Sequence, residues 1–196
     1  MSLTSQIVKV VESILRDEIV QHLEKFRLIK QSQHGFRKGF SCANNLLAFL
    51  ESVTASVDAK QNVDTVYLDF AKALDKVPHQ RLLCKLRTHG IDGVVCDWIA
   101  AWLKDRWQRV RLEGKHSSWR QVLSGVPQGS VLGPVLFLIF INDLEEGLHS
   151  DVLKFADDTK LYRAVCSQDD HVKLQSDLDN ICKWDDRWQM SFNGWR

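Results

Sequence analysis

The sequence predicts a fold of the α+β class, and three patterns support this prediction. Apolar residues recur at helical spacing at residues 7–26 and again at residues 174–188. Residues 63–70 instead alternate between apolar and polar side chains, which is the period of a half-buried strand. After two leading helices, the predicted elements run strand, helices, hairpin, helix, hairpin, helix. This order favours α+β over repeated βαβ units.

Length and composition are those of a globular protein with one core or two small lobes. The chain has 196 residues, 44% of them hydrophobic and 26% charged, which argues against disorder. The longest apolar run, residues 131–141, is about half of the roughly 20 residues that a membrane span needs. The amino end also lacks the pattern of a secretion signal. We therefore expect an intracellular protein, in the nucleus or cytoplasm, that is neither secreted nor bound to a membrane.

Two helices precede the predicted strand. Residues 7–26 form the first, which is amphipathic. A loop at residues 32–41, interrupted by Gly35 and Gly39, then leads to a second helix through residues 46–50.

The strand at residues 63–70 places one acidic side chain opposite its apolar face. By the period of two, Val66, Leu68 and Phe70 share one face, and Thr65, Tyr67 and Asp69 share the other. Asp69 therefore lies at the end of an apolar strand, directed away from the core.

The middle of the chain predicts two helices and a hairpin. Pro78 opens one helix, and apolar spacing at residues 95–102 marks the next. Residues 109–112 alternate and are followed by a turn at Gly114, which indicates a β-hairpin.

Basic residues gather in two segments, although the formal net charge of the whole chain is only +1. Residues 25–38 carry only basic charges, and residues 104–120 carry six basic side chains against Asp105 and Glu113. Such patches can follow a phosphate backbone. Ordinary solvated surface is the alternative interpretation.

The last part of the chain contains a constrained loop and a second hairpin. Two glycines and a proline at residues 124–129 exclude a helix there, and an apolar helix is predicted at residues 130–144. Residues 152–162 predict two short strands around Ala156-Asp157-Asp158, and the helix through residues 174–188 follows.

Three carboxylates are the candidate catalytic groups. Asp157 and Asp158 are adjacent in a predicted tight turn between apolar strands, where their mutual repulsion needs a compensating cation. Together with Asp69 they offer only oxygen ligands, which suit Mg²⁺ better than Zn²⁺. Such a site can hold two ions roughly 3.5–4 Å apart that assist phosphoryl chemistry. The alternative is that the Asp-Asp pair is only turn chemistry.

Four segments resemble successive motifs of reverse transcriptases. They are QSQHGFRKGFSC at residues 31–42, YLDFAKALDKVPH at residues 67–79, SGVPQGSVLGPVLFLIFINDL at residues 124–144 and KFADDTKLY at residues 154–162. The likeness is nearest to LINE-type retrotransposons without long terminal repeats, in particular the jockey-like branch. It implies a fingers-palm fold in which an antiparallel palm sheet packs on helices, with residues 1–62 as partial fingers and residues 63–196 as palm.

The resemblance implies a role for the three aspartates. Asp69 and Asp157 would bind two Mg²⁺ ions, for which Mn²⁺ is a possible substitute, and Asp158 would complete the metal site. The partners it implies are an RNA template, a DNA primer and deoxynucleoside triphosphates.

The same resemblance assigns further binding residues. Phe70 would offer its backbone near the incoming triphosphate, Leu74 would lie beside the sugar, and Gln128 would position template and nucleotide in a loop shaped by Gly129. Arg37 and Lys38 lie in the fingers motif, where contact with template or phosphate and solvated surface are both open.

This sequence departs from the family pattern at three places. Leu74 stands where the family usually has an aromatic residue that excludes a ribose 2′-hydroxyl, so we expect weakened sugar discrimination. An arginine expected to hold the triphosphate has no counterpart near the start. The likeness stops after residue 193, before the family's lysine, and we expect neither a thumb nor an endonuclease.

We expect an RNA-directed DNA polymerase domain that transfers nucleotides onto a primer 3′-hydroxyl. A decayed or co-opted remnant that at most binds nucleic acid is the main alternative. A metal-dependent nuclease ranks last, because it leaves the loop around Gln128 unexplained.

Overall fold

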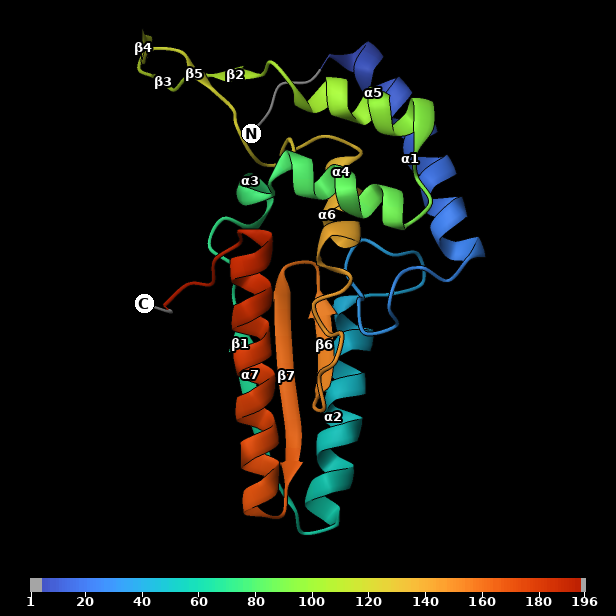
Figure 1. Ribbon diagram of the computed structural model, residues 1–196, viewed down its shortest axis with the longest axis vertical. Helices are drawn as coiled ribbons and strands as arrows, with labels where there is room; N and C mark the ends of the chain where they lie inside the picture. Colours follow the sequence, from blue (N-terminus) through green and yellow to red (C-terminus); the bar gives the residue numbers. More distant parts are fainter. Residues whose placement is uncertain (1–4, 195–196) are drawn as a thin grey trace.

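The computed structural model describes residues 5–194 and shows helices packed around antiparallel strands (Figure 1). The helices are α1 (Gln6–Lys25), α2 (Cys42–Asp58), α3 (Ala73–Lys76), α4 (His79–Thr88), α5 (Gly93–Leu103), α6 (Gly133–Ile141) and α7 (Gln168–Trp188). The strands are β1 (Asn62–Leu68), β2 (Trp107–Gln108), β3 (Arg111–Leu112), β4 (Lys115–His116), β5 (Arg120–Gln121), β6 (Asp151–Phe155) and β7 (Asp158–Val165). These named strands all pair antiparallel, so the α+β prediction is confirmed.

The central sheet has three strands in the order β1-β7-β6, and a long helix covers each of its faces. Successive side chains of β7 point to opposite faces. Tyr162 contacts Phe49 of α2, with ring centroids 5.1 Å apart, whereas Leu161 belongs to the core that includes Ile181 of α7. α2 and α7 therefore lie on opposite sides of the sheet, and Figure 1 shows them flanking the strands.

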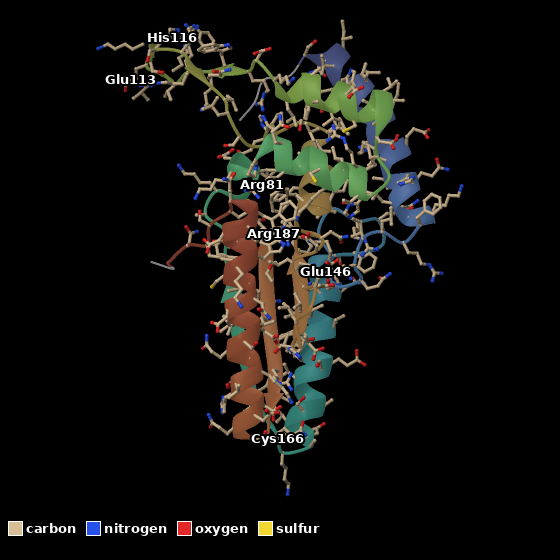
Figure 2. All side chains as sticks on the ribbon, in the orientation of Figure 1. Arg81, Glu113, His116, Glu146, Cys166 and Arg187 are labelled. Atoms are coloured by element: carbon tan, nitrogen blue, oxygen red, sulfur yellow. The ribbon has the colours of Figure 1, made fainter. Side chains whose placement is uncertain are left out.

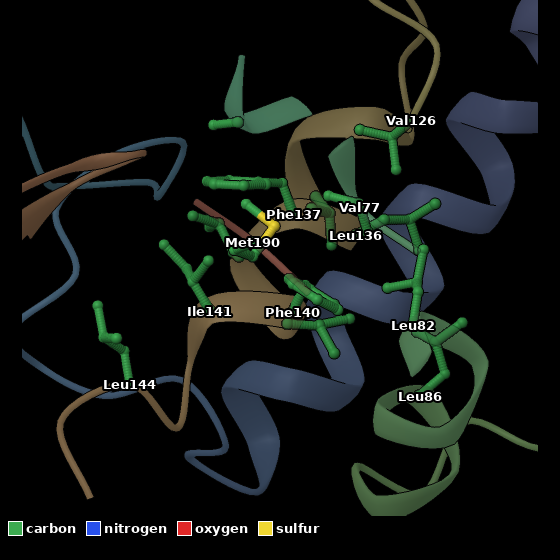
Figure 3. Close-up of a cluster of buried hydrophobic side chains, with 14 of the residues drawn as sticks. Val77, Leu82, Leu86, Val126, Leu136, Phe137, Phe140, Ile141, Leu144 and Met190 are labelled. Carbon is green, nitrogen blue, oxygen red and sulfur yellow. The ribbon is translucent and has the colours of Figure 1, made fainter. Parts of the chain in front are cut away.

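The main hydrophobic core surrounds α6, beyond one end of the sheet. Eight of the nine residues of α6 are buried, and the helix packs against Leu82 and Leu86 of α4 (Figure 3). Each large apolar side chain buried in this way contributes about 1.5–3 kcal/mol relative to exposure. Within residues 5–194, no helix combines the length and apolar character needed to cross a membrane.

α6 begins later and ends earlier than the helix predicted at residues 130–144, and its late start follows from a turn that the preceding residues close. The hydroxyl of Ser130 donates to the carbonyl of Pro127 at 2.7 Å and accepts from the backbone N–H of Gly133 at 3.0 Å. Ser130 is thus part of the loop, and the helix begins only at Gly133. The predicted start at residue 130 was wrong for this reason.

A buried glutamate joins α1 to the start of α6. Glu12 is fully buried, and its Oε2 accepts hydrogen bonds from the backbone N–H groups of Val131 at 2.6 Å and Leu132 at 3.4 Å. A helix start presents unpaired N–H groups and a positive dipole end, both of which a carboxylate stabilises. The apolar side chains Ile7 and Val10 of α1 are exposed instead. The amphipathic pattern therefore identifies the buried residues Ile19 and Leu23 in the second half of this helix but not those in its first half.

Asp185, in the last turn of α7, should destabilise the fold when it is ionised. Its Oδ1 is shielded from solvent without a hydrogen-bond partner among the described residues. Burial, followed by the charge of Asp186, raises its pKa from 3.8 to about 6. The folded state therefore binds more protons than the unfolded state between about pH 4 and 6, and stability falls as pH rises through this window.

We expect Asp185→Asn to raise the free energy of unfolding at pH 7 by about 1 kcal/mol, after discounting for partial exposure. At pH 4 the change should be small, because Asp185 is then protonated in the folded state. Urea denaturation at both pH values measures this difference. Asp97→Asn is the matched control, because Asp97 is an exposed carboxylate in the interior of α5, away from both helix ends. An equal gain at pH 4 and pH 7 would contradict the assignment.

Candidate active site

The turn between β6 and β7 carries two of the three candidate carboxylates. Phe155 pairs with Asp158, so Ala156 and Asp157 form a two-residue turn, which we call the aspartate turn (residues 155–158). Ala156 has a φ of +57°, in the left-handed region that non-glycine residues rarely adopt. The surrounding structure must therefore stabilise this conformation.

A single glutamine side chain supplies that stabilisation. Gln33 is buried, and its Oε1 accepts from the backbone N–H of Ala156 at 2.9 Å while its Nε2 donates to the carbonyl of Ala156 at 3.1 Å. The same Oε1 also accepts from the N–H of Gly35 at 2.8 Å. Gln33 thus satisfies both backbone groups of the strained residue.

The loop that holds Gln33 lies directly against β6. In this Gln33 loop (residues 32–35), the N–H of His34 donates to the carbonyl of Lys154, and the N–H of Lys154 donates to the carbonyl of Ser32, each at 2.8 Å. A Cβ on Gly35 would lie 2.2 Å from the backbone nitrogen of Ala156, so only glycine allows this approach. Backbone pairing and close packing therefore fix the aspartate turn to a segment more than a hundred residues earlier.

The buried residue Lys154 stabilises the region around the aspartate turn and the Gln33 loop. It is fully buried and forms an ion pair with Glu145, with a distance of 3.1 Å between Nζ and Oε2. Burial lowers the pKa of Lys154, and the charge and hydrogen bond of Glu145 oppose this shift. Oε2 of Glu145 also accepts from the hydroxyl of Ser32 at 2.5 Å, so the ion pair is linked to the Gln33 loop.

Asp69 reaches the same end of the sheet from β1. Leu68, the last residue of β1, pairs with Thr159, and continuing this register places Asp69 opposite Asp158, with both side chains on one face. Asp69 is exposed, and its Oδ2 accepts from Nδ2 of Asn193 at 2.8 Å. Asp69 therefore arrives at the same end of the sheet as the adjacent pair Asp157 and Asp158, although it lies almost ninety positions earlier in the sequence.

The charges of these aspartates influence one another. Burial raises the pKa of Asp157, and the negative charges of Asp158 and Asp69 raise it further, against a lowering by a backbone hydrogen bond. In the part of the chain that the structure describes, no three His, Cys, Asp or Glu side chains are already gathered as a metal-ligand set. The carboxylates thus repel one another across the site, and a divalent cation would offset this repulsion.

A segment near the end of the described chain supports Asp69 and Phe70. The N–H of Asn193 donates to the carbonyl of Asp69 at 2.8 Å, and the N–H of Ala71 donates to the carbonyl of Ser191 at 2.7 Å. These two bonds flank a bridge between Phe70 and Phe192, whose rings stack 4.3 Å apart. The N–H and carbonyl of Phe70 therefore point away from this segment. The likeness to the family pattern stops after residue 193, and nothing in the sequence indicated Asn193 as a partner of Asp69.

The Gln128 loop (residues 124–130) packs on α3. The N–H groups of Val126 and Gly125 donate to the carbonyls of Leu74 and Val77, at 2.7 and 2.8 Å. A Cβ on Gly125 would lie 2.5 Å from the carbonyl oxygen of Asp75, so this glycine permits the contact. The loop is thus rigidly attached beside half-buried Leu74.

The two candidate binding residues of the Gln128 loop, Gln128 and Gly129, are accessible. Gln128 is exposed, and its Nε2 donates to Oδ1 of Asp75 at 3.2 Å. Gly129 is also exposed and has a φ of +87°. Both residues remain available to a ligand.

Arg37 and Lys38 lie beside the Gln33 loop and differ in their contacts. The guanidinium of Arg37 donates to the carbonyls of Lys30 at 3.0 Å and Gln33 at 2.9 Å, and it lies 4.2 Å from the ring centroid of Phe40. Arg37 therefore stabilises the loop. Lys38 is exposed, and both residues border a cavity of about 250 Å³ that is lined in part by Leu23.

The fold is shared with two solved telomerase structures. One is the apo telomerase from Candida tropicalis truncated from its C-terminal domain, with a TM-score of 0.59 at 15% identity over 85% of this chain and 36% of that chain. The other is telomerase from Candida albicans in complex with the TWJ fragment of telomeric RNA, with a TM-score of 0.63 at 12% identity over 95% of this chain and 34% of that chain. The chain thus has a reverse transcriptase-like fold.

Sequence comparison identifies the family. The family described as "Reverse transcriptase (RNA-dependent DNA polymerase)" matches residues 1–194, and the chain belongs to this family. Curated relatives include the probable RNA-directed DNA polymerase from transposon X-element of Drosophila melanogaster, 30% identical over 98% of this chain. The RNA-directed DNA polymerase from mobile element jockey of Drosophila funebris is also 30% identical over 98% of this chain. The chain spans 22% of the length of each, and the resemblance to jockey-like elements is confirmed.

Removing the Gln33 side chain should weaken the attachment of the aspartate turn. Gln33→Ala leaves three buried backbone groups of Ala156 and Gly35 without partners, and each costs about 1–3 kcal/mol. We expect the free energy of unfolding, measured by urea denaturation, to fall by at least about 2 kcal/mol. Gln31→Ala is the matched control, since Gln31 is exposed and should change stability by less than about 0.5 kcal/mol. Equal effects of the two substitutions would show that Gln33 does not stabilise the turn.

Proposed function

We propose that this chain forms the fingers and palm of an RNA-directed DNA polymerase of a non-LTR retrotransposon. The reaction joins a deoxynucleotide to the 3′-hydroxyl of a DNA primer and releases pyrophosphate, with an RNA strand as template. One observation carries the proposal, namely that Asp69, Asp157 and Asp158 arrive from two strands at the same end of the sheet. Family membership supports the same conclusion.

The donor set fits a pair of divalent cations. Asp69 and Asp157, completed by Asp158, offer only carboxylate oxygens, which Mg²⁺ prefers and Mn²⁺ accepts. The raised pKa of Asp157 reflects burial and like charges that a cation would counter. When bound, two such ions activate the attacking hydroxyl and stabilise the leaving pyrophosphate.

The neighbouring residues orient the nucleotide in this proposal. The N–H of Phe70, turned away from residues 190–193, faces the triphosphate, and the side chain of Phe70 holds that backbone by stacking on Phe192. Gln128 contacts the template base or the nucleotide opposite it, and the φ of Gly129 shapes the loop. Lys38 is free to contact template phosphate, while Arg37 acts mainly through the loop that it holds.

Residues 1–62 act as partial fingers and residues 63–196 as palm. The Gln33 loop and α2 connect the two parts by packing on the sheet. The RNA template, DNA primer and deoxynucleoside triphosphates are the substrates. This function is carried out inside the cell, in the nucleus or the cytoplasm.

Primer extension on an RNA template with Mg²⁺ tests the proposal. Asp157→Asn and Asp69→Asn should each reduce extension to the level without protein, because each removes a carboxylate that would hold the ions. Asp151→Asn is the matched control, since Asp151 is an exposed carboxylate at the far end of the same hairpin. It should leave extension unchanged.

The same assay separates the alternatives. If wild type and Asp157→Asn give equal background, the chain does not polymerise, and the remnant that at most binds nucleic acid is the better assignment. Loss of labelled RNA or DNA without added nucleotides, abolished by Asp157→Asn, would instead indicate a nuclease.

Leu74 should set the choice of sugar in this proposal. It is half-buried in α3, and its carbonyl anchors Val126 of the Gln128 loop. We expect the wild type to incorporate ribonucleotides and deoxynucleotides at comparable rates. Leu74→Phe should reduce ribonucleotide incorporation by about tenfold through steric exclusion while leaving deoxynucleotide incorporation unchanged. Strong rejection of ribonucleotides by the wild type would refute this role of Leu74.

A further inference from the structure

A long β-hairpin extends from the body of the protein without contributing to the core. This basic hairpin (residues 106–121) contains β2 to β5 and reaches outward in Figure 1. Figure 2 shows Glu113 and His116 at its tip. Its strands are joined by hydrogen bonds such as that from the N–H of Val122 to the carbonyl of Arg106 at 2.8 Å. Every residue from 107 to 121 is exposed, so packing does not account for the side chains of the basic hairpin.

The basic hairpin and the residues leading into it are strongly positive. Residues 104–120 carry six basic side chains against Asp105 and Glu113, whereas the whole chain carries a net charge of only +1. Among residues 5–194, none of these six basic groups takes part in an ion pair. The positive charge is therefore available to an anionic polymer.

Two exposed tryptophans lie on the same basic hairpin. Trp107 and Trp119 are 58% and 54% exposed, and the guanidinium of Arg109 lies 4.5 Å from the ring centroid of Trp119. A flat aromatic surface beside an arginine is the arrangement on which unpaired bases stack while their phosphates pair with the cation. Bases inside a duplex do not expose their faces in this way.

A cavity lies between the basic hairpin and the Gln128 loop. It has a volume of about 920 Å³, and its lining includes Trp119 and Arg109 of the basic hairpin together with Lys72 and Gln128. Cavities of roughly 300–1,000 Å³ hold drug-sized ligands. There is thus room beside Gln128 for a nucleotide unit of a bound strand.

Arg106 lines this cavity and has an unsatisfied donor. Its Nη1 is shielded from solvent and has no hydrogen-bond partner among the described residues. A shielded donor without a partner is unusual in a folded protein, and a phosphate is an acceptor that matches the geometry of a guanidinium. This observation is independent of the exposed side chains and also indicates an anionic ligand.

We propose that the basic hairpin and the adjoining cavity bind unpaired RNA, which is the template strand before it reaches Gln128. The interpretation of this strand as template rests on the proposed function. The binding itself requires neither divalent ions nor nucleotides. Trp119 and Trp107 stack on bases, and Arg106, Arg109 and Arg111 contact phosphates.

Fluorescence anisotropy with a labelled single-stranded oligoribonucleotide, without divalent ions or nucleotides, tests this proposal. Trp119→Ala should weaken binding by about tenfold or more through lost stacking. Arg109→Ala should weaken binding and also reduce the slope of log K against log salt by about 0.7, the value for one phosphate contact on a single strand. Arg87→Ala is the charge-matched control, since Arg87 is exposed on α4, and it should bind as the wild type does.

Two further measurements distinguish failure of this proposal from failure of the proposed function. Asp157→Asn should bind the oligoribonucleotide like the wild type even where it abolishes extension. A duplex RNA of the same length should bind more weakly than the single strand. Unchanged affinity and salt slope in both Trp119→Ala and Arg109→Ala, with melting temperatures equal to that of the wild type, would overturn the proposal. Stronger binding of the duplex would also overturn it.

Discussion

The antiparallel pairing of β1 with β7 is the constraint on which the candidate site depends. The register that pairs Leu68 with Thr159 also brings Asp69, the next residue, to the end of the sheet that carries Asp158, although the two residues are almost ninety positions apart in the chain. A shift of one residue would move Asp69 to the opposite face of the sheet, because side chains alternate along a strand. The position of the third carboxylate is therefore a consequence of strand register rather than of any local motif.

Buried polar side chains then fix the parts that the register does not determine. Gln33 satisfies the backbone of Ala156, Glu12 accepts from the N–H groups that precede α6, and Glu145 pairs with Lys154. Leaving such groups unpaired is expensive in a low dielectric, so each of these contacts specifies a single arrangement. A repulsive cluster of carboxylates needs this support, because the fold gains no stability from bringing like charges together.

The sequence predicted the helices and strands well, but it did not predict which distant residues contact one another. Period-two alternation identified β1 and placed Asp69 opposite the apolar face, and helical spacing located α4, α5 and α7, because these signals are local. The two glycines and the proline of residues 124–129 predicted a constrained loop around Gln128, and the attachment of this loop to α3 agrees with that prediction.

The contacts of Gln33 with Ala156 and of Asn193 with Asp69 could not be predicted in this way. Each joins residues more than a hundred positions apart, and neither glutamine nor asparagine carries a pattern that indicates its partner. The early start predicted for α6 failed for a related reason. The hydroxyl of Ser130 closes a turn with Pro127, and apolar periodicity does not report such a bond.

Binding of Mn²⁺ followed by electron paramagnetic resonance tests most directly whether Asp69 and Asp157 hold the same ions. We predict that Asp69→Asn and Asp157→Asn each weaken binding and that the double variant loses less than the sum of the two single losses, because residues that share a ligand are coupled. Mn²⁺ binding by Asp69→Asn that equals the wild type, beside a clear loss in Asp157→Asn, would contradict the account.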